Sequence, residues 1–382
     1  MDALKVALVH DWLTGMRGGE KCLEVFSELW PQAELFTLLA TPEKLSPGLQ
    51  KHRLHTSFLQ GIPGITRWYR HLLPLMPAAI ARLRLPVVDV VLSSSHCVAK
   101  SIPVPQGVPH ICYCHTPMRY AWHMRETYLA SMKAYLRPVA RLLLNWLRTW
   151  DRQTASRVTH FIANSGTVQQ RIREAYGRDS VVVYPPVDTQ FYTPSPVARE
   201  DYYLIVSALV PYKRLELAID ACNRLGRKLV IIGTGEMLDK LQATAGPYIT
   251  FLGWGSNEII RDHLRRCQAL LFPGEEDFGI VPVEANACGT PVIAFGRGGA
   301  TETIVPPNSS REPTGLWFAD QTTEGLCMAI QELEAHRGDF SPQSCRRQAV
   351  QFSRDRFARQ IAERVTLAVM GQEWLPIVRH AA

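Results

Sequence analysis

Two glutamates stand out in the segment from Phe272 to Ile304, the part of the sequence that is richest in chemistry. Glu276 and Glu284 have seven residues between them, and a Phe-Gly pair lies in that interval. Pro282 and an apolar run predict a helix that opens here with Glu284 in its first turn, since proline suits a helix start. Free N–H groups at a helix start attract phosphate. Carboxylates accept hydrogen bonds from hydroxyl groups, at about 1.5–3 kcal/mol each. The segment therefore predicts a site for a nucleotide sugar.

A pair of cations lies in the segment Leu209–Arg214, which follows an expected strand and opens an expected helix. Lys213 and Arg214 are suited to neutralising a diphosphate, together with the backbone amides of a Gly18-Gly19 loop ahead of another helix. Glycine lets the backbone approach an anion closely because it has no Cβ. Such groups would stabilise a departing diphosphate, which is usually the largest contribution to catalysis of this kind.

Histidines end two of the expected strands, and ligands gather at the carboxyl ends of parallel strands. His115 follows the strand expected at residues 110–114, His10 ends the first strand, and His96 follows three serines. The candidates for acceptor contacts, at strand ends or beside His115, are His10, Asp11, Arg119, Tyr120, Asn164 and Ser165. The last two have an alternative role as a helix N-cap.

Short apolar runs alternate with helical periodicity along the chain, which predicts α/β domains with parallel, doubly wound sheets. Residues 4–9 form a continuous apolar run, as expected for a strand buried on both faces. Proline-rich stretches at residues 184–187 and 192–196 mark the exit from a first domain. The expected strands are residues 4–10, 87–93, 110–114, 161–164 and 181–184 before that exit, and residues 203–206, 228–232, 250–252, 269–272 and 291–294 after it.

The composition is that of a globular protein, with 46% hydrophobic residues in 382. The net charge of +7 favours an anionic partner. No zinc-finger, RNP or helix-turn-helix signature accompanies that charge, so nucleic acid is not an expected partner. Nine scattered cysteines without metal or redox spacing predict buried, reduced thiols. We expect neither a secretory signal nor a spanning helix, because no cleavable leader pattern and no apolar run of eighteen residues is present.

A basic amphipathic helix is predicted from Met132 to Arg152. Its cations fall within a stripe roughly 100° wide at the helical period. Two alternatives follow: an interfacial helix on anionic lipid, or a surface helix whose apolar side packs on its own domain. A second basic and apolar stretch lies at residues 68–85. If it faces the same side of the domain as the amphipathic helix, the two together favour a lipid-pyrophosphate acceptor. The cations are Lys133, Arg137, Arg141, Arg148 and Arg152, and Tyr135, Leu142, Trp146 and Trp150 fall on the other side.

The block from Phe272 to Glu302 resembles the E-x7-E signature of the retaining glycosyltransferases of the GT4 type, which have the GT-B fold. The match extends beyond the glutamates through Gly289-Thr290-Pro291 and the Gly-Gly pair before Glu302. The resemblance implies two Rossmann-like, doubly wound domains that face each other across an interdomain cleft. We expect an acceptor-binding domain at residues 1–197, a nucleotide-sugar-binding domain at residues 198–355, and a C-terminal helix within residues 356–382 that crosses back to the first domain.

The resemblance also implies roles for single residues. Glu276 would bind hydroxyl groups of the transferred sugar, Glu284 the ribose, and His115 the donor sugar or phosphate. Where the family carries a first diphosphate-binding arginine, this chain has Ala208, and Arg214 is the candidate replacement. The expected catalytic residues are His115, Glu276 and Lys213. The expected donor contacts are Gly18, Gly19, Lys213, Arg214, Glu276, Phe278, Gly279, Ile280, Val281 and Glu284.

Two further motifs, Val-His-Asp-Trp-Leu-Thr near the start and Cys-His-Thr-Pro-Met-Arg-Tyr, resemble the branch that includes O-antigen mannosyltransferases. This resemblance implies transfer of mannose from GDP-mannose, without a cofactor or metal, in cell-surface polysaccharide biosynthesis. The implied acceptor is a polyprenyl-pyrophosphate-linked saccharide, and the implied location is cytoplasmic, peripheral on the inner face of the cell membrane. The alternatives are a nucleotide-sugar epimerase, a phosphorylase, or a non-catalytic nucleotide-binding protein.

Overall fold

The computed structural model of the chain describes residues 4–372 and residue 374. The chain divides into two compact units: unit 1 comprises Met1–Pro186 and Phe357–Ala382, and unit 2 comprises Val187–Arg356. Unit 2 begins ahead of the boundary expected after residue 197, because Val187 donates to Phe352 O at 3.0 Å and accepts from Arg354 N at 3.2 Å. Of the expected C-terminal segment 356–382, residues 373 and 375–382 lie outside the described part.

Unit 1 contains a parallel sheet of seven strands in the order β3-β2-β1-β4-β5-β6-β7. The strand order therefore reverses between β1 and β4. The sequence did not predict β2 and β3, which are short and lack a continuous apolar run. The strands are β1 (Val6–His10), β2 (Glu34–Thr37), β3 (Leu54–Thr56), β4 (Val90–Ser95), β5 (His110–Cys114), β6 (His160–Ala163) and β7 (Ser180–Val182).

Helices cover both faces of this sheet, and alternate residues of β1 belong to different cores: Leu8 to one, Ala7 and Val9 to the other. The core that contains Leu8 includes Phe26, which stacks on Phe357 with ring centroids 5.6 Å apart. The helices of unit 1 are α1 (Gly18–Leu29), α2 (Pro47–Gln50), α3 (Ile65–Trp68), α4 (Met76–Ala81), α5 (Arg125–Ser131), α6 (Arg137–Thr154), α7 (Gly166–Tyr176) and, from Phe357 onward, α15 (Arg354–Val369).

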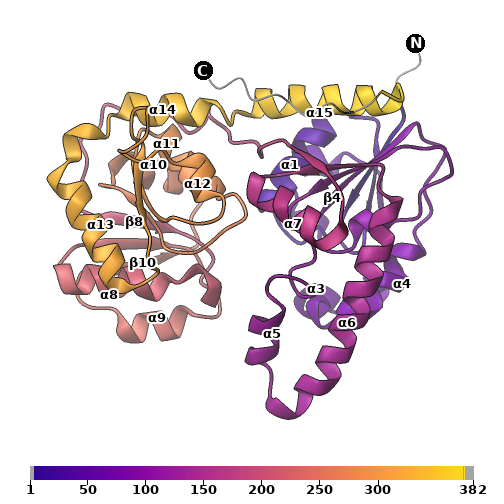
Figure 1. Cartoon of the computed structure of the whole chain (residues 1–382), viewed down its shortest axis with the longest axis horizontal. Coiled ribbons are helices and arrows are strands. Elements are labelled where there is room, and N and C mark those ends of the chain that lie inside the picture. Colours follow the sequence, from indigo (N-terminus) through magenta and orange to yellow (C-terminus); the bar gives the residue numbers. More distant parts are fainter. Residues whose placement is uncertain (1–3, 373, 375–382) are drawn as a thin grey trace. The chain divides into compact units, whose positions relative to one another are not determined.

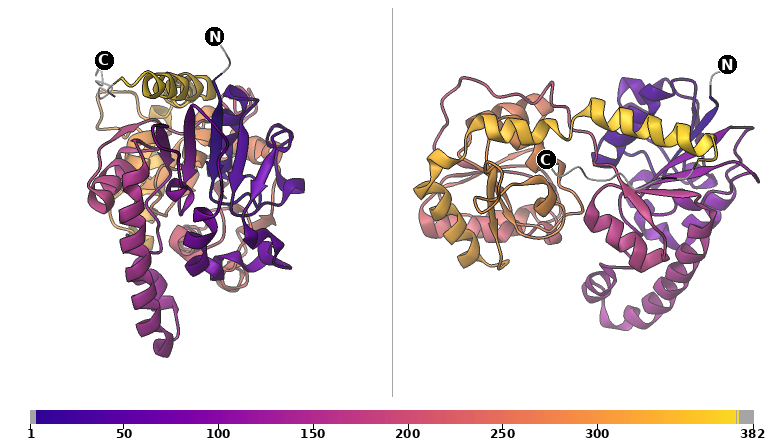
Figure 2. Two further views of the ribbon diagram at one scale, coloured as in Figure 1. Left: turned by 90° about the vertical axis from the view of Figure 1, so that its right-hand side faces the viewer. Right: turned by 45° about the horizontal axis from the view of Figure 1, so that its top comes forward.

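The helix predicted from Met132 to Arg152 begins only at Arg137 and corresponds to α6, with Pro138 in its first turn. A short 3-10 turn, η5 (Ala134–Leu136), separates it from α5. Helix α6 extends beyond the sheet of unit 1, and α5 lies beside it (Figures 1 and 2). One side of α6 packs on the domain through Leu144 and Leu147.

Unit 2 contains a parallel sheet of six strands in the order β10-β9-β8-β11-β12-β13, which reverses between β8 and β11. The sequence predicted all of its strands except β13. The strands are β8 (Tyr203–Val206), β9 (Leu229–Ile232), β10 (Ile249–Gly253), β11 (Leu270–Phe272), β12 (Val292–Phe295) and β13 (Gly315–Phe318). The helices are α8 (Leu215–Leu225), α9 (Leu238–Thr244), α10 (Asn257–Arg266), α11 (Ile280–Ala287), α12 (Ala300–Thr303), α13 (Thr323–Ala335) and α14 (Pro342–Val350).

The cysteines are core residues, as the sequence predicted. None of the nine, all of which lie in the described part of the chain, forms a disulfide, and Cys327 alone among them is not fully buried. Over the described residues, none of the helices combines the length and the apolar character needed to cross a bilayer.

Candidate active site

Two of the predicted donor-site residues of unit 2, Lys213 and Glu276, meet near the point where its strand order reverses. In doubly wound sheets, ligands bind in the crevice outside the carboxyl ends of the two strands at such a point. Lys213 follows β8 and Glu276 follows β11, and their side chains form an ion pair. Both side chains are partly exposed, at 14% and 24%. They line a small pocket with Ser207, the backbone of the two strand ends, and Gly274.

Glycines hold the loop around Glu276 in place by close backbone contact. A Cβ on Gly274 would lie 2.9 Å from Lys213 Cα, and one on Gly299 would lie 2.2 Å from Phe278 Cα. Gly299 also donates its N–H to Glu276 O at 2.8 Å. The distance between the lysine and the glutamate is therefore fixed by backbone packing that only glycine permits.

Helix α11 begins at Ile280, with Gly279 before it in the left-handed region (φ 83°). The prediction that Glu284 lies in the first turn is wrong, since Glu284 is the fifth residue of the helix and Pro282 the third. Proline is accommodated there because the first four N–H groups of a helix have no partner within it. Glu284 is 4% exposed. The pKa of the Tyr192 phenol is raised, mainly because the phenol is buried and secondly because of the charge of Glu284. The N–H groups of Ile280 and its neighbour Val281 belong to this anion-attracting first turn.

Arg214 stands between η7 (Pro211–Lys213) and α8 in the left-handed region (φ 53°), the one non-glycine residue of the described chain to do so. Its guanidinium group donates to Glu216 Oε1 at 2.6 Å and to Gln321 Oε1 at 3.2 Å. Left-handed backbone costs a side-chain-bearing residue about 1–2 kcal/mol, and such strain gathers at functional sites. Arg214 thus already has two partners within unit 2, while Ala208, in the place of the family arginine, is exposed.

The predicted residues of unit 1 also meet where the strand order reverses, between β1 and β4. His10 Nδ1 lies 3.0 Å from Ser94 Oγ, and Ser94 Oγ lies 2.8 Å from His115 Nε2. His96 completes a group of three imidazoles, with ring centroids 5.9 Å from His10 and 6.3 Å from His115. A Cβ on Gly19 would lie 3.4 Å from both His10 Cε1 and His115 Nε2, so the start of α1 borders this group.

Asp11 organises the end of β4 rather than facing a ligand. It is fully buried, and its carboxylate accepts hydrogen bonds from the backbone N–H groups of residues 96 to 99, at 2.6–2.9 Å. Burial raises the pKa of Asp11, and His10 and these amides act in the opposite direction. The predicted acceptor contact is replaced by a structural one, because the carboxylate satisfies four amides that helix and sheet leave unpaired.

Burial shifts the pKa values of His10, His96 and Glu20 in the direction that favours their uncharged forms. Burial, and then His96, lower the pKa of His10 to about 3. Partial burial and then the positive charge of Arg119 lower the pKa of His96, whose side chain keeps 31% of its surface exposed. Burial raises the pKa of Glu20, in the first turn of α1, to about 7. His10 is therefore neutral at neutral pH, whereas Glu20 titrates close to it.

The remaining predicted residues of unit 1 lie either at the start of α7 or in the segment that follows His115. Ser165 is the N-cap of α7, with its hydroxyl accepting from Val168 N at 3.1 Å, and Asn164 beside it is 6% exposed. This agrees with the capping alternative. Arg119 and Tyr120 are half-buried, and Tyr120 packs on Tyr128 with ring centroids 4.7 Å apart.

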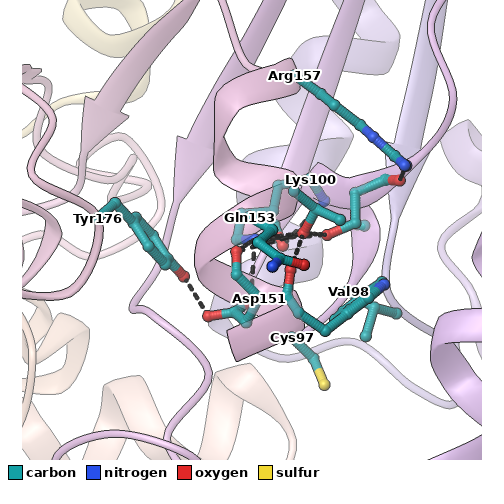
Figure 3. Close-up of polar contacts among 12 residues, drawn as sticks. Cys97, Val98, Lys100, Asp151, Gln153, Arg157 and Tyr176 are labelled. Carbon is teal, nitrogen blue, oxygen red and sulfur yellow. Dashed lines mark hydrogen bonds and ion pairs between the residues drawn. The ribbon is translucent and has the colours of Figure 1, made fainter. Parts of the chain in front are cut away.

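Sequence reasoning missed a buried ion pair that supports the β4 end (Figure 3). Lys100, 1% exposed, pairs with Asp151 of α6 at 2.8 Å, and its ammonium lies 4.9 Å from the Tyr176 ring centroid. Asp151 also accepts from Trp122 Nε1 at 2.8 Å and from Tyr176 Oη at 2.9 Å. The partners are far apart in sequence, so no local pattern signals them. Their contact joins α6 to the loop that Asp11 holds.

Two family models match adjoining parts of the chain: "Glycosyltransferase Family 4" covers residues 18–191, and "Glycosyl transferases group 1" covers residues 190–351. A D-inositol 3-phosphate glycosyltransferase of Mycobacteroides abscessus is 29% identical over 213 residues, which is 49% of this chain and 47% of that protein. A GDP-mannose-dependent alpha-(1-6)-phosphatidylinositol monomannoside mannosyltransferase of Mycobacterium tuberculosis is 29% identical over 227 residues, 51% of this chain and 56% of that protein. The chain thus spans about half the length of these curated relatives.

Among solved structures, the complex of Anabaena HepE with UDP is similar, with a TM-score of 0.71 and 18% identity over 95% of this chain and 100% of that one. At this identity the likeness concerns the fold. The two matched models together cover residues 18–351, and both units have the parallel sheets of that fold. The chain therefore belongs to the GT4-type glycosyltransferases, whose two α/β domains define the GT-B fold.

Proposed function

We propose that this chain is a retaining glycosyltransferase that moves a hexose from a nucleotide sugar, with GDP-mannose as the favoured donor. The observation that carries the proposal is the meeting of Lys213 and Glu276 at the point where the unit 2 sheet reverses its order. A cation beside a carboxylate suits a ligand with one anionic and one hydroxyl-rich part. The mycobacterial relative is named for GDP-mannose, and HepE has been solved with UDP and with UDP-glucose; both support the nucleotide-sugar class.

In the proposed reaction, the ion-pair partner of Lys213 changes when the donor binds. A donor diphosphate would compete with Glu276 for the Lys213 ammonium, and Glu276 would then be released to accept hydrogen bonds from sugar hydroxyls. The bond from the anomeric carbon to the diphosphate oxygen breaks as a bond to the acceptor oxygen forms on the same face. The acceptor proton can pass to the departing phosphate oxygen. Lys213 and the first-turn amides of α11 stabilise the charge that develops there, so we propose that transfer needs no metal.

For the acceptor, we propose a polyprenyl-pyrophosphate-linked saccharide in cell-surface polysaccharide biosynthesis, reached from a membrane surface. Helix α6 supports this part through an exposed apolar stripe: Tyr135 just before it is 71% exposed, and Val139, Leu142 and Trp146 are 68%, 73% and 48% exposed. These residues recur at the spacing of one helix face. Arg141, Arg148 and Arg152, also exposed, form a separate stripe, about a third of a turn around the helix from the apolar one. Apolar side chains together with arginines suit an anionic lipid interface.

A transfer assay tests the function. The purified chain is incubated with GDP-mannose labelled in the sugar and a crude lipid extract, and the label is followed into the lipid phase beside the release of GDP. We expect an α-linked mannosyl lipid, formed equally well with EDTA. Glu276→Gln is expected to lower the rate roughly tenfold to hundredfold, and Glu332→Gln, an exposed glutamate on α13, is the matched control. GDP release without a labelled product, or an epimerised sugar nucleotide, would instead favour the non-transferase alternatives.

Vesicle flotation tests the membrane part. We expect the full chain to float with vesicles that contain anionic lipid and to stay behind with neutral ones. Replacing Leu142 and Trp146 by serine should abolish flotation, whereas Met328→Ser, which removes an equally exposed apolar side chain of α13 (63%), should leave it intact. Flotation that ignores lipid charge, or that survives the loss of the α6 stripe, counts against a peripheral location on the inner face of the membrane.

A further inference from the structure

Ser94 lies between two imidazoles at the end of β4. Its hydroxyl is 3.0 Å from His10 Nδ1 and 2.8 Å from His115 Nε2. Ser94 and His10 are fully buried, and His115 is partly exposed. In the described chain, His10 Nε2 is buried and has no hydrogen-bond partner. The sequence predicted roles for both histidines but none for the serine.

The hydrogen atoms of this group can be placed by counting donors and acceptors. A serine hydroxyl carries one hydrogen, and a neutral imidazole carries one hydrogen on one of its two ring nitrogens. If Ser94 donated to His10 Nδ1, the His10 hydrogen would sit on Nε2, buried without an acceptor. If both histidines donated to Ser94, the serine hydrogen would have no acceptor among the contacts of that hydroxyl.

One arrangement gives an acceptor to the ring hydrogen of His10 and to the hydroxyl hydrogen of Ser94. In it, His10 donates from Nδ1 to Ser94, and Ser94 donates to His115 Nε2. What stays unsatisfied is the lone pair of His10 Nε2, and an unpaired buried acceptor is more common in proteins than an unpaired N–H. The hydrogen of His115 is then on Nδ1.

We propose that Ser94 is a positioning residue which, supported by His10, holds His115 in the tautomer that carries its hydrogen on Nδ1. His115 thereby meets the donor as a hydrogen-bond donor of fixed direction. The proposal deepens the proposed function and rests on it for the contact between His115 and the donor. It does not rest on it for the tautomer, which is a property of the protein without ligand.

The surroundings of His10 favour a constant arrangement. Burial lowers the pKa of His10 to about 3, with His96 as the next cause, so the ring stays neutral at neutral pH. A protonated His10 would also carry a hydrogen on Nε2, which is buried without a hydrogen-bond partner. A Cβ added to Gly19 would contact Cε1 of His10 and Nε2 of His115, so the start of α1 lies beside both rings.

The chain offers a matched control on the opposite face of the same strand. Ser93 is as deeply buried as Ser94, and its hydroxyl lies 2.8 Å from Nε2 of another histidine, His110. Ser93→Ala therefore removes a buried serine–histidine bond of the same kind, without touching the pair at the candidate site.

Nitrogen NMR of the full chain labelled with ¹⁵N-histidine tests the tautomer without any donor or acceptor. The His115 signals are assigned by their loss in His115→Gln. We expect His115 to show a protonated Nδ1 and a bare Nε2 in the wild type and in Ser93→Ala. In Ser94→Ala we expect the two ring nitrogens to exchange or reverse these roles, and in Ser94→Thr we expect the wild-type pattern. A wild-type His115 that carries its hydrogen on Nε2 would overturn the proposal.

Turnover provides the second readout. We expect Ser94→Ala to lower kcat roughly tenfold, the effect of one hydrogen bond, with a smaller change in the donor KM, and Ser94→Thr to restore it. Equal kcat in Ser94→Ala and Ser93→Ala would also overturn the proposal. A wild-type chain that transfers no sugar but shows the expected tautomer would refute the proposed function and leave the role of Ser94 in place.

Discussion

The two units place their candidate residues at equivalent points of equivalent sheets but give them opposite electrostatic character. In unit 2, Lys213 and Glu276 are charged, partly exposed and paired with each other. In unit 1, His10 is buried and neutral, and burial raises the pKa of Glu20 to about 7. The same topology therefore supports two kinds of recognition: a charged half suited to a diphosphate and a neutral half suited to hydroxyl groups and directed hydrogen bonds.

The backbone arrangement differs in the same way. The unit 2 loops pack backbone against backbone, so that Gly274 and Gly299 have no room for a Cβ. In unit 1, the end of β4 is held instead by the Asp11 carboxylate and by the buried Lys100–Asp151 pair. The loops of unit 2 are therefore held by close backbone packing at glycines, and the β4 end of unit 1 by a network of side chains.

The substitution expected to have the largest effect removes the ammonium group of Lys213 from the unit 2 site. We expect Lys213→Ala to lower the transfer rate about a hundredfold to a thousandfold, as for other losses of a group that stabilises charge in the transition state. The initial rate at saturating donor measures it. Lys240→Ala, an exposed lysine on α9, is the control and should transfer at the wild-type rate. A wild-type rate in Lys213→Ala would remove the contrast between the halves.

A pair of glycine substitutions tests the second difference. A Cβ on Gly299 would meet backbone at 2.2 Å, whereas one on Gly19 would meet only side-chain atoms, at 3.4 Å. We expect Gly299→Ala to lower the free energy of unfolding by about 1–3 kcal/mol or more, and Gly19→Ala to leave it unchanged or slightly raised, because alanine favours a helix. Urea unfolding measures both. Equal losses would show that the two halves are held in the same way.

A further test of the comparison concerns the pH dependence of stability. Because the pKa of Glu20 is raised in the folded state, from 4.5 to about 7, its contribution to stability is complete below pH 4.5 and is lost as the pH rises through 7. We expect Glu20→Gln, which keeps the helix cap, to be more stable than the wild type at pH 8, by about 3 kcal/mol. The advantage should vanish near pH 4. Parallel stability curves for the two proteins would mean that Glu20 is ionised in unit 1.

Much of this architecture could be predicted from the sequence, because buried parallel strands are short apolar runs that end in polar residues. That pattern located β1, β5, β8 and β11, and with them His10, His115, Lys213 and Glu276. It failed for β2, β3 and β13, which are short and interrupted by polar residues or lie at a sheet edge. It also misplaced the start of α11, because Gly279 rather than Pro282 precedes the helix.

The parts that could not be predicted depend on long-range contacts. Asp11 reads as an exposed ligand residue at a strand end, and only the fold reveals that it accepts four amides more than eighty residues away. In the sequence, Ser94 is one of three consecutive serines with nothing to distinguish it. Because side chains alternate between the two faces of β4, Ser94 contacts His115 whereas Ser93 contacts His110. The sequence also could not show which apolar residues of α6 are buried. In the structure, Leu144 and Leu147 pack inward, while Leu142 and Trp146 remain exposed.

The central claim is that the Lys213–Glu276 pair of unit 2 recognises a nucleoside diphosphate. Isothermal titration of the full chain with GDP, and with UDP and ADP for comparison, measures this most directly in the wild type, Lys213→Ala and Lys240→Ala. We predict that GDP binds most tightly, and that Lys213→Ala weakens its binding by roughly tenfold to hundredfold, while Lys240→Ala binds like the wild type. Equal GDP affinity in Lys213→Ala and the wild type would contradict the account.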